Sequence, residues 1–585
     1  MFSPVRARKR PTKGTFTVIR HSSPISGVAA HEDSYVATAG YDNHVILWDQ
    51  RTRVPLARVA HDHLANQCAF SPDGRFLVTS SSDYSARIWS VPDMRLRAVL
   101  GHHEDDVEMS AFHPTEEKVA TASRDHRVRV FDFAGDLLHV FAGHKADVIS
   151  VGWSHDGREI ISSSDDGTIK RWSLETGGLV EDLDLGGVET DTVAIGGNGT
   201  VYAGNDEGEL IVLRDGERHY VPAHDAGIKR VVLGEERGLL ITLSYDRTMR
   251  LWDVSGPTPQ LRDSVALPPV VWPRTCAFAA GSEIVFGTFG DRYHRYDFAA
   301  GRWSEDPVAP TWGLNAVAVH GGSTYTIGDA GVLWRDGEVH AQPDSLCNFL
   351  TPVGDTVVTG GQLGTVFDAL TGSPVHQHRS PLNCAVAFER DGRRHVVVGA
   401  YTGEGVVLAE ADDGTLEHIR DVPLHGNAVK GVALSGELIF SVSADGGAAW
   451  HETGGLTRRH TLADAHGMIA NGCVGLGDGG WFASVSRDLV LRLWSPDFTV
   501  TEVPTPHRHS LKCVSADDEG RRIAIGAYNG RVTVYDRETG RWSTDARPTT
   551  AGISSMTYDS DRGLFLASSY DGAVREIAPD ASRTA

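Results

Sequence analysis

The apolar positions of the chain alternate with polar positions in short runs that end at turn-forming residues. Residues 143–172 read GHKADVISVGWSHDGREIISSSDDGTIKRW, with two alternating apolar runs and a shorter third one separated by HDG and DDG. Alternation with a period of two predicts strands, and Asp-Gly turns between such runs predict hairpins. This segment is therefore predicted to form three antiparallel strands.

The same pattern recurs along the whole chain. Segments ending in AGYDNHVILWD (39–49), LSYDRTMRLWD (223–253) and VSRDLVLRLW (465–494) are clear copies. The aromatic or apolar residue that ends each third strand serves as a phase marker; the markers are Trp48, Trp89, Phe131, Trp172, Leu213, Trp252, Tyr296, Trp334, Phe367, Leu408, His451, Trp494, Tyr535 and Ile577. Most successive markers lie 39 to 44 residues apart, and only the steps into Trp334 and Phe367 are shorter. A period of about 40 residues predicts a repeat architecture.

Polar residues are also in register with the markers. A histidine lies 28 residues before the marker in several copies, and an aspartate lies six before it. In four copies a serine two before the aspartate completes a set: His61/Ser81/Asp83/Trp89, His144/Ser164/Asp166/Trp172, His224/Ser244/Asp246/Trp252 and His466/Ser486/Asp488/Trp494. These residues resemble the structural tetrad of the WD40-repeat family. The resemblance implies an all-β fold of propeller blades, in which each tetrad is a buried hydrogen-bond chain.

Serine, histidine and aspartate together also invite comparison with a catalytic triad. A triad needs a single exposed serine beside an oxyanion site, whereas this set recurs at fixed spacing and ends on tryptophan. No nucleophile elbow, phosphate-binding loop or zinc-protease motif is present, and His61-x-His63 shares a residue with a tetrad. The sequence therefore predicts no catalytic, cofactor or metal site. The alternative is a hydrolase or lyase site over a central channel, with His44, Asp291, Arg292 and His294 as candidates.

Fourteen markers exceed the four to eight blades, roughly, of one propeller, so two seven-bladed β-propellers are predicted. The expected divisions are a basic arm (1–13), a first propeller (14–305), a second propeller (306–578) and a tail (579–585). Too few residues follow Ile577 for another strand, and residues 15–20 (TFTVIR) offer a spare one. That strand closes the last blade, or it closes the blade near Tyr296 while residues 302–308 cross to the last one. The layout resembles the actin-interacting two-propeller family, from which only the architecture is carried over.

The predicted function is a non-catalytic scaffold or adaptor that binds partner proteins or peptides on the propeller faces. In the family the docking face carries the loops before the first strands and the turns that hold the tetrad aspartate. Tyrosine, tryptophan and arginine are enriched at binding hot spots. Here the candidates on those loops and turns are Tyr41, Arg124, Tyr245, Arg247, Trp272, Trp312, Arg487, Tyr528 and Tyr570. Because they span both halves of the chain, two separate docking faces are expected.

The net charge of the chain indicates which classes of partner molecule it can bind. The formal net charge is −22, from 77 acidic against 55 basic residues, and a field of that sign repels nucleic acid and anionic lipid. The acidic run Glu104-Asp105-Asp106 and the pair Asp412-Asp413 suit a partner with basic segments. No run reaches the roughly 20 apolar residues of a membrane span, and a cytoplasmic location is expected. The oligomeric state and the identity of the partner are not determined by the sequence.

Overall fold

The computed structural model describes residues 19–580, apart from 33, 344 and 478, and consists almost wholly of β-strands. Each strand pairs antiparallel with the next strand of its sheet, and among the described residues there are thirteen four-stranded sheets and one three-stranded sheet. Every phase marker from Trp48 to Ile577 lies on the third strand of a sheet. The predicted all-β repeat of fourteen units is confirmed.

Seven sheets, the first lobe, contain the strands β1 (Ile25–His31), β2 (Tyr35–Gly40), β3 (His44–Asp49), β4 (Pro55–Ala60); β5 (Ala65–Phe70), β6 (Phe76–Ser81), β7 (Ala86–Ser90), β8 (Leu96–Leu100); β9 (Val107–Phe112), β10 (Lys118–Ser123), β11 (Arg127–Asp132), β12 (Leu137–Ala142); β13 (Val148–Trp153), β14 (Glu159–Ser164), β15 (Thr168–Ser173), β16 (Leu179–Asp184); β17 (Thr192–Ile195), β18 (Val201–Gly204), β19 (Glu209–Arg214), β20 (Glu217–Pro222); β21 (Ile228–Gly234), β22 (Leu239–Ser244), β23 (Thr248–Asp253), β24 (Gln260–Ala266); β25 (Val271–Phe278), β26 (Glu283–Thr288), β27 (His294–Asp297) and β28 (Arg302–Trp303). A single turn of 3-10 helix, η1 (Glu235–Arg237), precedes β22.

The other seven sheets, the second lobe, contain the strands β29 (Leu314–His320), β30 (Ser323–Gly328), β31 (Leu333–Arg335), β32 (Glu338–Ala341); β33 (Cys347–Val353), β34 (Thr356–Gly361), β35 (Thr365–Asp368), β36 (Ser373–Gln377); β37 (Leu382–Arg390), β38 (Arg393–Ala400), β39 (Glu404–Glu410), β40 (Leu416–Pro423); β41 (Val429–Ser435), β42 (Leu438–Ser443), β43 (Ala448–Glu452), β44 (Arg458–Leu462); β45 (Ala470–Gly475), β46 (Phe482–Ser486), β47 (Val490–Trp494), β48 (Val500–Pro504); β49 (Leu511–Ala516), β50 (Arg522–Ala527), β51 (Val532–Asp536), β52 (Arg541–Ala546); β53 (Ile553–Asp559), β54 (Leu564–Ser569) and β55 (Val574–Ile577).

Burial within a sheet changes from the first strand to the fourth. In β14 every residue after Glu159 is buried, whereas β16 alternates between half-buried and exposed positions. The reason is that neighbouring sheets cover both faces of the middle strands, while the fourth strand lies at the rim. The core is therefore a series of clusters between adjacent sheets, such as the one that joins Val130 and Phe141 to Trp153 and Trp172.

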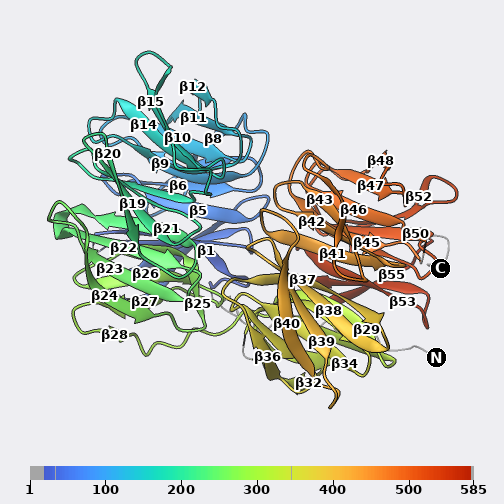
Figure 1. Cartoon of the computed structure of the whole chain (residues 1–585). Helices are drawn as coiled ribbons and strands as arrows, with labels where there is room; N and C mark the ends of the chain where they lie inside the picture. Colours follow the sequence, from blue (N-terminus) through green and yellow to red (C-terminus); the bar gives the residue numbers. More distant parts are fainter. Residues whose placement is uncertain (1–18, 33, 344, 478, 581–585) are drawn as a thin grey trace, which may run out of the picture.

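Contacts between first strands run in a closed series in each lobe. In the first lobe β1 packs against β5 on one side and against β25 on the other, and in the second lobe β29 packs against both β33 and β53. One core cluster combines Ile25 and Trp48 of the first sheet with Val285 and Tyr293 of the seventh. Figure 1 shows the two lobes side by side, blue to green and yellow to red.

The strand predicted to close a ring falls largely outside the described residues, which begin at residue 19; residues 19 and 20 lie in no strand. Arg302 and Trp303 pair with Asp297 and Tyr296 as the fourth strand of the seventh sheet, so they do not cross to the last sheet. The predicted basic arm, 1–13, and residues 581–585 of the tail also lie outside the described part. The predicted boundary at 305/306 falls between β28 and β29.

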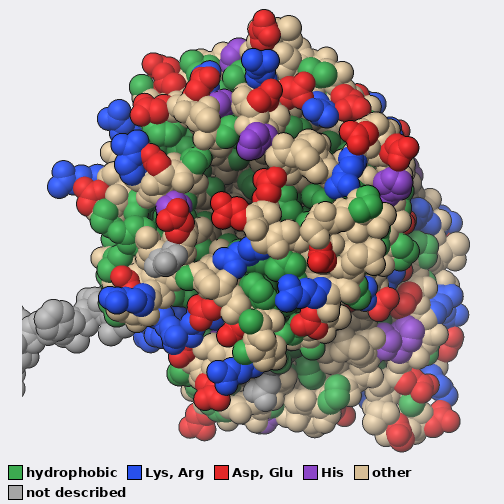
Figure 2. All heavy atoms as spheres, turned by 90° about the vertical axis from the view of Figure 1, so that its left-hand side faces the viewer, with side chains coloured by type: hydrophobic (Ala, Val, Ile, Leu, Met, Phe, Trp, Pro, Cys, Tyr) green, Lys and Arg blue, Asp and Glu red, His purple; other side chains and the backbone are tan. Residues whose placement is uncertain are grey.

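The face of the molecule drawn in Figure 2, on the side of the first lobe, carries acidic and basic side chains interspersed with one another. This face presents no broad field of one sign. Within residues 19–580, gaps excepted, no helix is long and apolar enough to span a bilayer.

Candidate functional site

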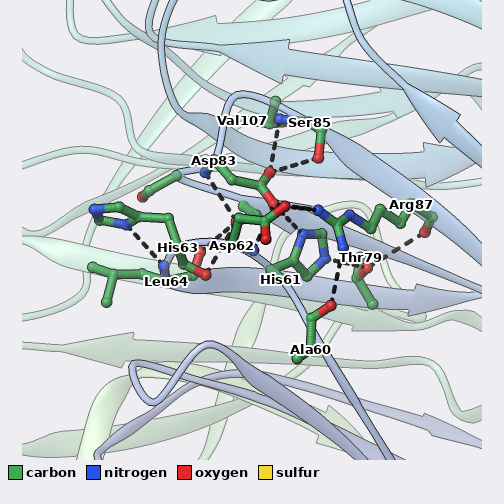
Figure 3. A network of polar contacts seen from close by, with 12 residues as sticks. Ala60, His61, Asp62, His63, Leu64, Thr79, Asp83, Ser85, Arg87 and Val107 are labelled. Carbon is green, nitrogen blue, oxygen red and sulfur yellow. Dashed lines mark hydrogen bonds and ion pairs between the residues drawn. The ribbon is translucent and has the colours of Figure 1, made fainter. Parts of the chain in front are cut away.

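Each clear repeat contains a buried chain of hydrogen bonds that begins at a histidine, and Figure 3 shows the one around His61. In the second sheet Nδ1 of His61 lies 2.9 Å from Oδ2 of Asp83, and its Nε2 lies 2.7 Å from Oγ1 of Thr79. The indole Nε1 of Trp89 donates to the same Thr79 hydroxyl at 2.9 Å. The histidine, aspartate and tryptophan of the predicted tetrad thus belong to one network, and its buried polar groups have partners.

The sequence pattern predicted the wrong hydroxyl for the tetrads: the residue that joins histidine to tryptophan lies two positions before the predicted serine. The groups that join histidine to tryptophan are Thr79, Ser162, Thr242 and Ser484. Ser81, Ser164, Ser244 and Ser486 instead accept a hydrogen bond from the backbone N–H of the aspartate two residues on. Both hydroxyls of each pair lie on the same side of the second strand, because side chains two residues apart share a face.

The hydrogen-bond networks of two individual repeats also differ from the predicted tetrad. His21, Thr38, Asp42 and Trp48 form a complete network that the fixed spacing missed, with Nε2 of His21 2.8 Å from Thr38 Oγ1. In the twelfth sheet Nδ1 of His466 lies 3.1 Å from the carbonyl oxygen of Gly446 instead of contacting Asp488. Asp488 pairs with Arg492 and accepts the backbone N–H of Gly467.

The loop-and-turn faces of the two lobes meet each other. Loops before first strands and turns between second and third strands supply the contacts: Arg487 pairs with Asp106, Asn427 Nδ2 donates to Glu189 Oε1 at 2.5 Å, and Tyr84 Oη lies 3.4 Å from Ser510 Oγ. The rings of His63 and Tyr528 are 4.8 Å apart, and those of Tyr245 and Tyr401 6.3 Å. The expectation of two separate docking faces is therefore corrected.

A cavity of about 1070 Å³ lies between these faces. It brings together all the predicted partner-binding residues except Arg247 and Trp312: Tyr41, Arg124, Tyr245, Trp272, Arg487, Tyr528 and Tyr570. The ring of Tyr41 meets the edge of Trp272 at 5.2 Å, and Arg124 pairs with Glu108 and Asp147. Side chains from opposite ends of the sequence thus form a single site.

The remaining candidates lie elsewhere. Arg247 donates to the carbonyl oxygens of Val271 and Pro268, which ties one sheet to the next. Trp312 is 59% exposed and lies outside the cavity lining. Asp412, in the turn after β39, pairs with Arg393.

The residues considered for a hydrolytic site do not line the cavity: His44, Asp291, Arg292 and His294. His294 stacks on Trp303 at 5.4 Å, and Asp291 accepts the backbone N–H of Ala309. No group of three or more His, Cys, Asp or Glu side chains in the described chain is placed to hold a metal ion.

Sequence reasoning missed a ring of polar side chains at the start of the first strands. In every sheet of the second lobe, the second residue of the first strand has no partner in the register with the second strand. This irregularity is a β-bulge, which redirects the side chain of that residue. The redirected residues are Asn315, Asn348, Asn383, Lys430, Asn471, Lys512 and Ser554. Asn348 Nδ2, for example, donates to the carbonyl oxygen of Leu382 in the next sheet at 2.8 Å. The available signal was a polar residue directly after a buried apolar one, such as Leu382-Asn383.

The first-lobe wall of the cavity is rich in carboxyl groups with raised pKa values. Burial raises the pKa of Glu189 to about 8, and the neighbouring Asp206 and Asp191 add to the rise. Burial and the adjacent Asp106 likewise raise the pKa of Asp105 to about 7. Burial, with added repulsion from Asp191 and Glu189, raises the pKa of Asp165 as well. Perturbed carboxyl groups of this kind concentrate at functional sites.

The raised pKa of Glu189 predicts that ionisation of this side chain destabilises the fold as the pH rises from about 6 to 8. The folded protein holds the Glu189 proton more tightly than the unfolded chain, so its contribution to stability is present below its ordinary pKa of 4.5 and is lost as the pH rises to about 8. Glu189→Gln should therefore raise the melting temperature more at pH 8 than at pH 6, which changes the difference between the two melting temperatures. Scanning calorimetry at about pH 6 and pH 8 measures these melting temperatures.

Glu104→Gln is the matched control, since the Glu104 side chain is 72% exposed on the same side of the first lobe. That variant should keep the wild-type pH dependence. An unchanged difference in Glu189→Gln would contradict the assignment of this proton to Glu189.

Comparison with known proteins places the first repeats in a family. The sequence model "WD domain, G-beta repeat" matches residues 13–49, 54–90, 94–132 and 135–173. Ribosome assembly protein 4 of Saccharomyces cerevisiae is 37% identical over 65 residues, which are 11% of this chain and 13% of that protein. Nuclear distribution protein PAC1 of Gibberella zeae is 30% identical over 91 residues, 14% and 20% of the two chains. F-box/WD repeat-containing protein 5 of Rattus norvegicus is 34% identical over 59 residues, 10% of each. The chain therefore spans at most a fifth of the length of these relatives.

Proposed function

We propose that the chain, whose first four repeats match the WD-repeat model between residues 13 and 173, is a WD40-repeat protein throughout and a non-catalytic binding platform built from two closed seven-bladed propellers. The closed series of first-strand contacts in each lobe supports the two rings. We propose residues 14–305 and 306–578 as the two units. Its relatives, with names such as ribosome assembly protein 4 and nuclear distribution protein PAC1, are matched over at most a fifth of their length, so their activities are not carried over.

The observation that carries the proposal is the convergence of both docking faces on one cavity. Aromatic side chains of both lobes line it, among them Tyr41 and Trp272 of the first and Tyr528 and Tyr570 of the second. Such side chains supply large contact areas with a polar end. At about 1070 Å³ the cavity is at the upper end of the range for small-molecule pockets. We propose that it receives a segment of a partner polypeptide.

The chemistry of the first-lobe wall fits a partner segment with basic residues. The wall includes Asp105, Asp147, Asp165, Glu189 and Asp206, and fewer cationic side chains lie beside them. Lysine or arginine side chains of a partner would neutralise carboxylates that are otherwise held close together, and would lower their raised pKa values. We propose the cytoplasm as the place where this binding occurs.

The test is capture of partners from native extract with a photoreactive amino acid in place of Tyr41, followed by mass spectrometry of the cross-linked peptides. A partner peptide cross-linked at position 41, and lost in a Tyr570→Ala background, is expected. The matched control carries the same photoreactive residue at Trp312, an aromatic position outside the cavity that is 59% exposed. Equal cross-linking from both positions, or none from position 41, would contradict a partner site in the cavity.

A further inference from the structure

Three lysines occupy equivalent positions in three sheets. Lys229, Lys430 and Lys512 are each the second residue of a first strand, at the bulge that redirects a side chain. All three line the cavity. Each ammonium lies over a tyrosine of a turn between second and third strands: Nζ of Lys229 is 5.2 Å from the ring centroid of Tyr245, that of Lys430 4.3 Å from Tyr401, and that of Lys512 5.8 Å from Tyr528.

The three lysines differ in their counter-charges. Lys229, in the first lobe, pairs with Asp191 at 2.5 Å and with Asp206. In the described part of the chain, neither Lys430 nor Lys512 has a carboxylate within ion-pair distance. The repeat therefore provides an internal comparison. A lysine at the same strand position, over the same kind of ring, has its charge neutralised by carboxylates in the first lobe but not in the second.

The charges of Lys430 and Lys512 both act on the hydroxyl group of Tyr401. Burial alone would raise the pKa of Tyr401, but the charges of Lys430 and Lys512, together with hydrogen bonds from Lys430 and Gln362, lower it. Two like charges that face one partly buried cavity repel each other, and each loses part of its hydration. A tyrosine face offsets only a fraction of this cost, about 0.5–2 kcal/mol. An anion bound in the cavity beside these lysines would reduce both the repulsion and the cost of lost hydration.

We propose that the second-lobe side of the cavity is an anion site, in which Lys430 and Lys512 bind a carboxylate or phosphate group of the ligand. Lysine serves as a mobile point charge for such groups. This inference rests on the proposed function and specifies its ligand, which would present basic groups to the carboxyl-rich first-lobe wall and an acidic group to this lysine pair. The two walls together select a ligand that carries both signs of charge.

The test is isothermal titration of the full-length protein with sodium phosphate and with sodium succinate, against sodium chloride of equal ionic strength. Binding of one of these anions to the wild type is expected, and the better one identifies the group as phosphate or carboxylate. The double variant Lys430→Gln/Lys512→Gln should weaken it by at least about tenfold, since loss of one charge-assisted hydrogen bond already corresponds to that factor. Lys512→Arg, which keeps the charge, should retain binding.

The matched control is Lys145→Gln, an exposed lysine on the first-lobe side of the same cavity, which should bind the anion as the wild type does. Thermal unfolding in chloride checks folding, and the double variant should melt no lower than the wild type because two unpaired charges have been removed. Absence of binding to the wild type, or equal affinity in the double variant, would overturn the anion site. Cross-linking from position 41 would still be observed in that case if the proposed function holds, so the two failures are distinguishable.

Discussion

Arg487→Ala is expected to destabilise the protein by about 3–5 kcal/mol, the cost of leaving a buried ion pair with one member. The side chain of Asp106, its partner, is 3% exposed. Among the described residues it would keep one side-chain hydrogen bond, from the hydroxyl of Ser82, with the charge of Arg124 nearby. Burial opposes ionisation of Asp106, yet Arg487 and Arg124 together keep its pKa low. Because the pair joins the two lobes, its loss should also allow them to separate.

Thermal unfolding and small-angle scattering measure the two effects, a lower melting temperature and a larger radius of gyration. Adding Asp106→Asn to Arg487→Ala should restore part of the stability, because a neutral amide is less costly to bury than an unpaired carboxylate. Arg75→Ala is the matched control: its pair with Asp73 is exposed, 72% and 45%, and should contribute less than about 1 kcal/mol. Similar stabilities of Arg487→Ala and Arg75→Ala would show that the lobes do not depend on this pair.

Ser162→Ala is expected to have the second large effect. Its hydroxyl lies 2.8 Å from Nε2 of His144 and accepts from Nε1 of Trp172 at 2.9 Å. The variant leaves both buried nitrogen atoms without this partner, at about 1–3 kcal/mol each. Chemical denaturation monitored by tryptophan fluorescence should therefore show a loss of about 2–6 kcal/mol.

The chain offers two neighbouring serines as controls. Ser163 is fully buried, and its hydroxyl has no partner among the described residues, so Ser163→Ala should be neutral or stabilising. Ser164→Ala removes a hydroxyl that accepts the backbone N–H of Asp166 and donates to the carbonyl oxygen of Ala146 at 3.3 Å, a loss of about 1–2 kcal/mol. The reverse order, with Ser164→Ala more damaging than Ser162→Ala, would restore Ser164 to the tetrad and refute the network in the structure.

The comparison of these serines shows where sequence reasoning reached its limit within a repeat. The spacing of histidine, aspartate and tryptophan identified His144, Asp166 and Trp172, because these residues recur at fixed distances from the end of the third strand. It did not identify Ser162, because Ser162 and Ser164 share a strand face and have the same side chain. Only the position of Nε2 of His144 distinguishes them. His21 was missed for a related reason, since the loop before β1 places it one residue closer to its marker.

The sequence by itself determined the strands, the turns, the number of sheets and the types of side chain on one face of each lobe. These features are local: alternation, Asp-Gly turns and a period of about 40 residues all act within one repeat. Only the tertiary structure decided that the two faces meet around one cavity and that Arg487 pairs with a residue 381 positions away. It also decided that, within the described residues, no carboxylate pairs with Lys430 or Lys512 as Asp191 and Asp206 pair with Lys229. Docking of two lobes depends on the shape and charge of whole surfaces, and no periodic pattern along the chain encodes that fit.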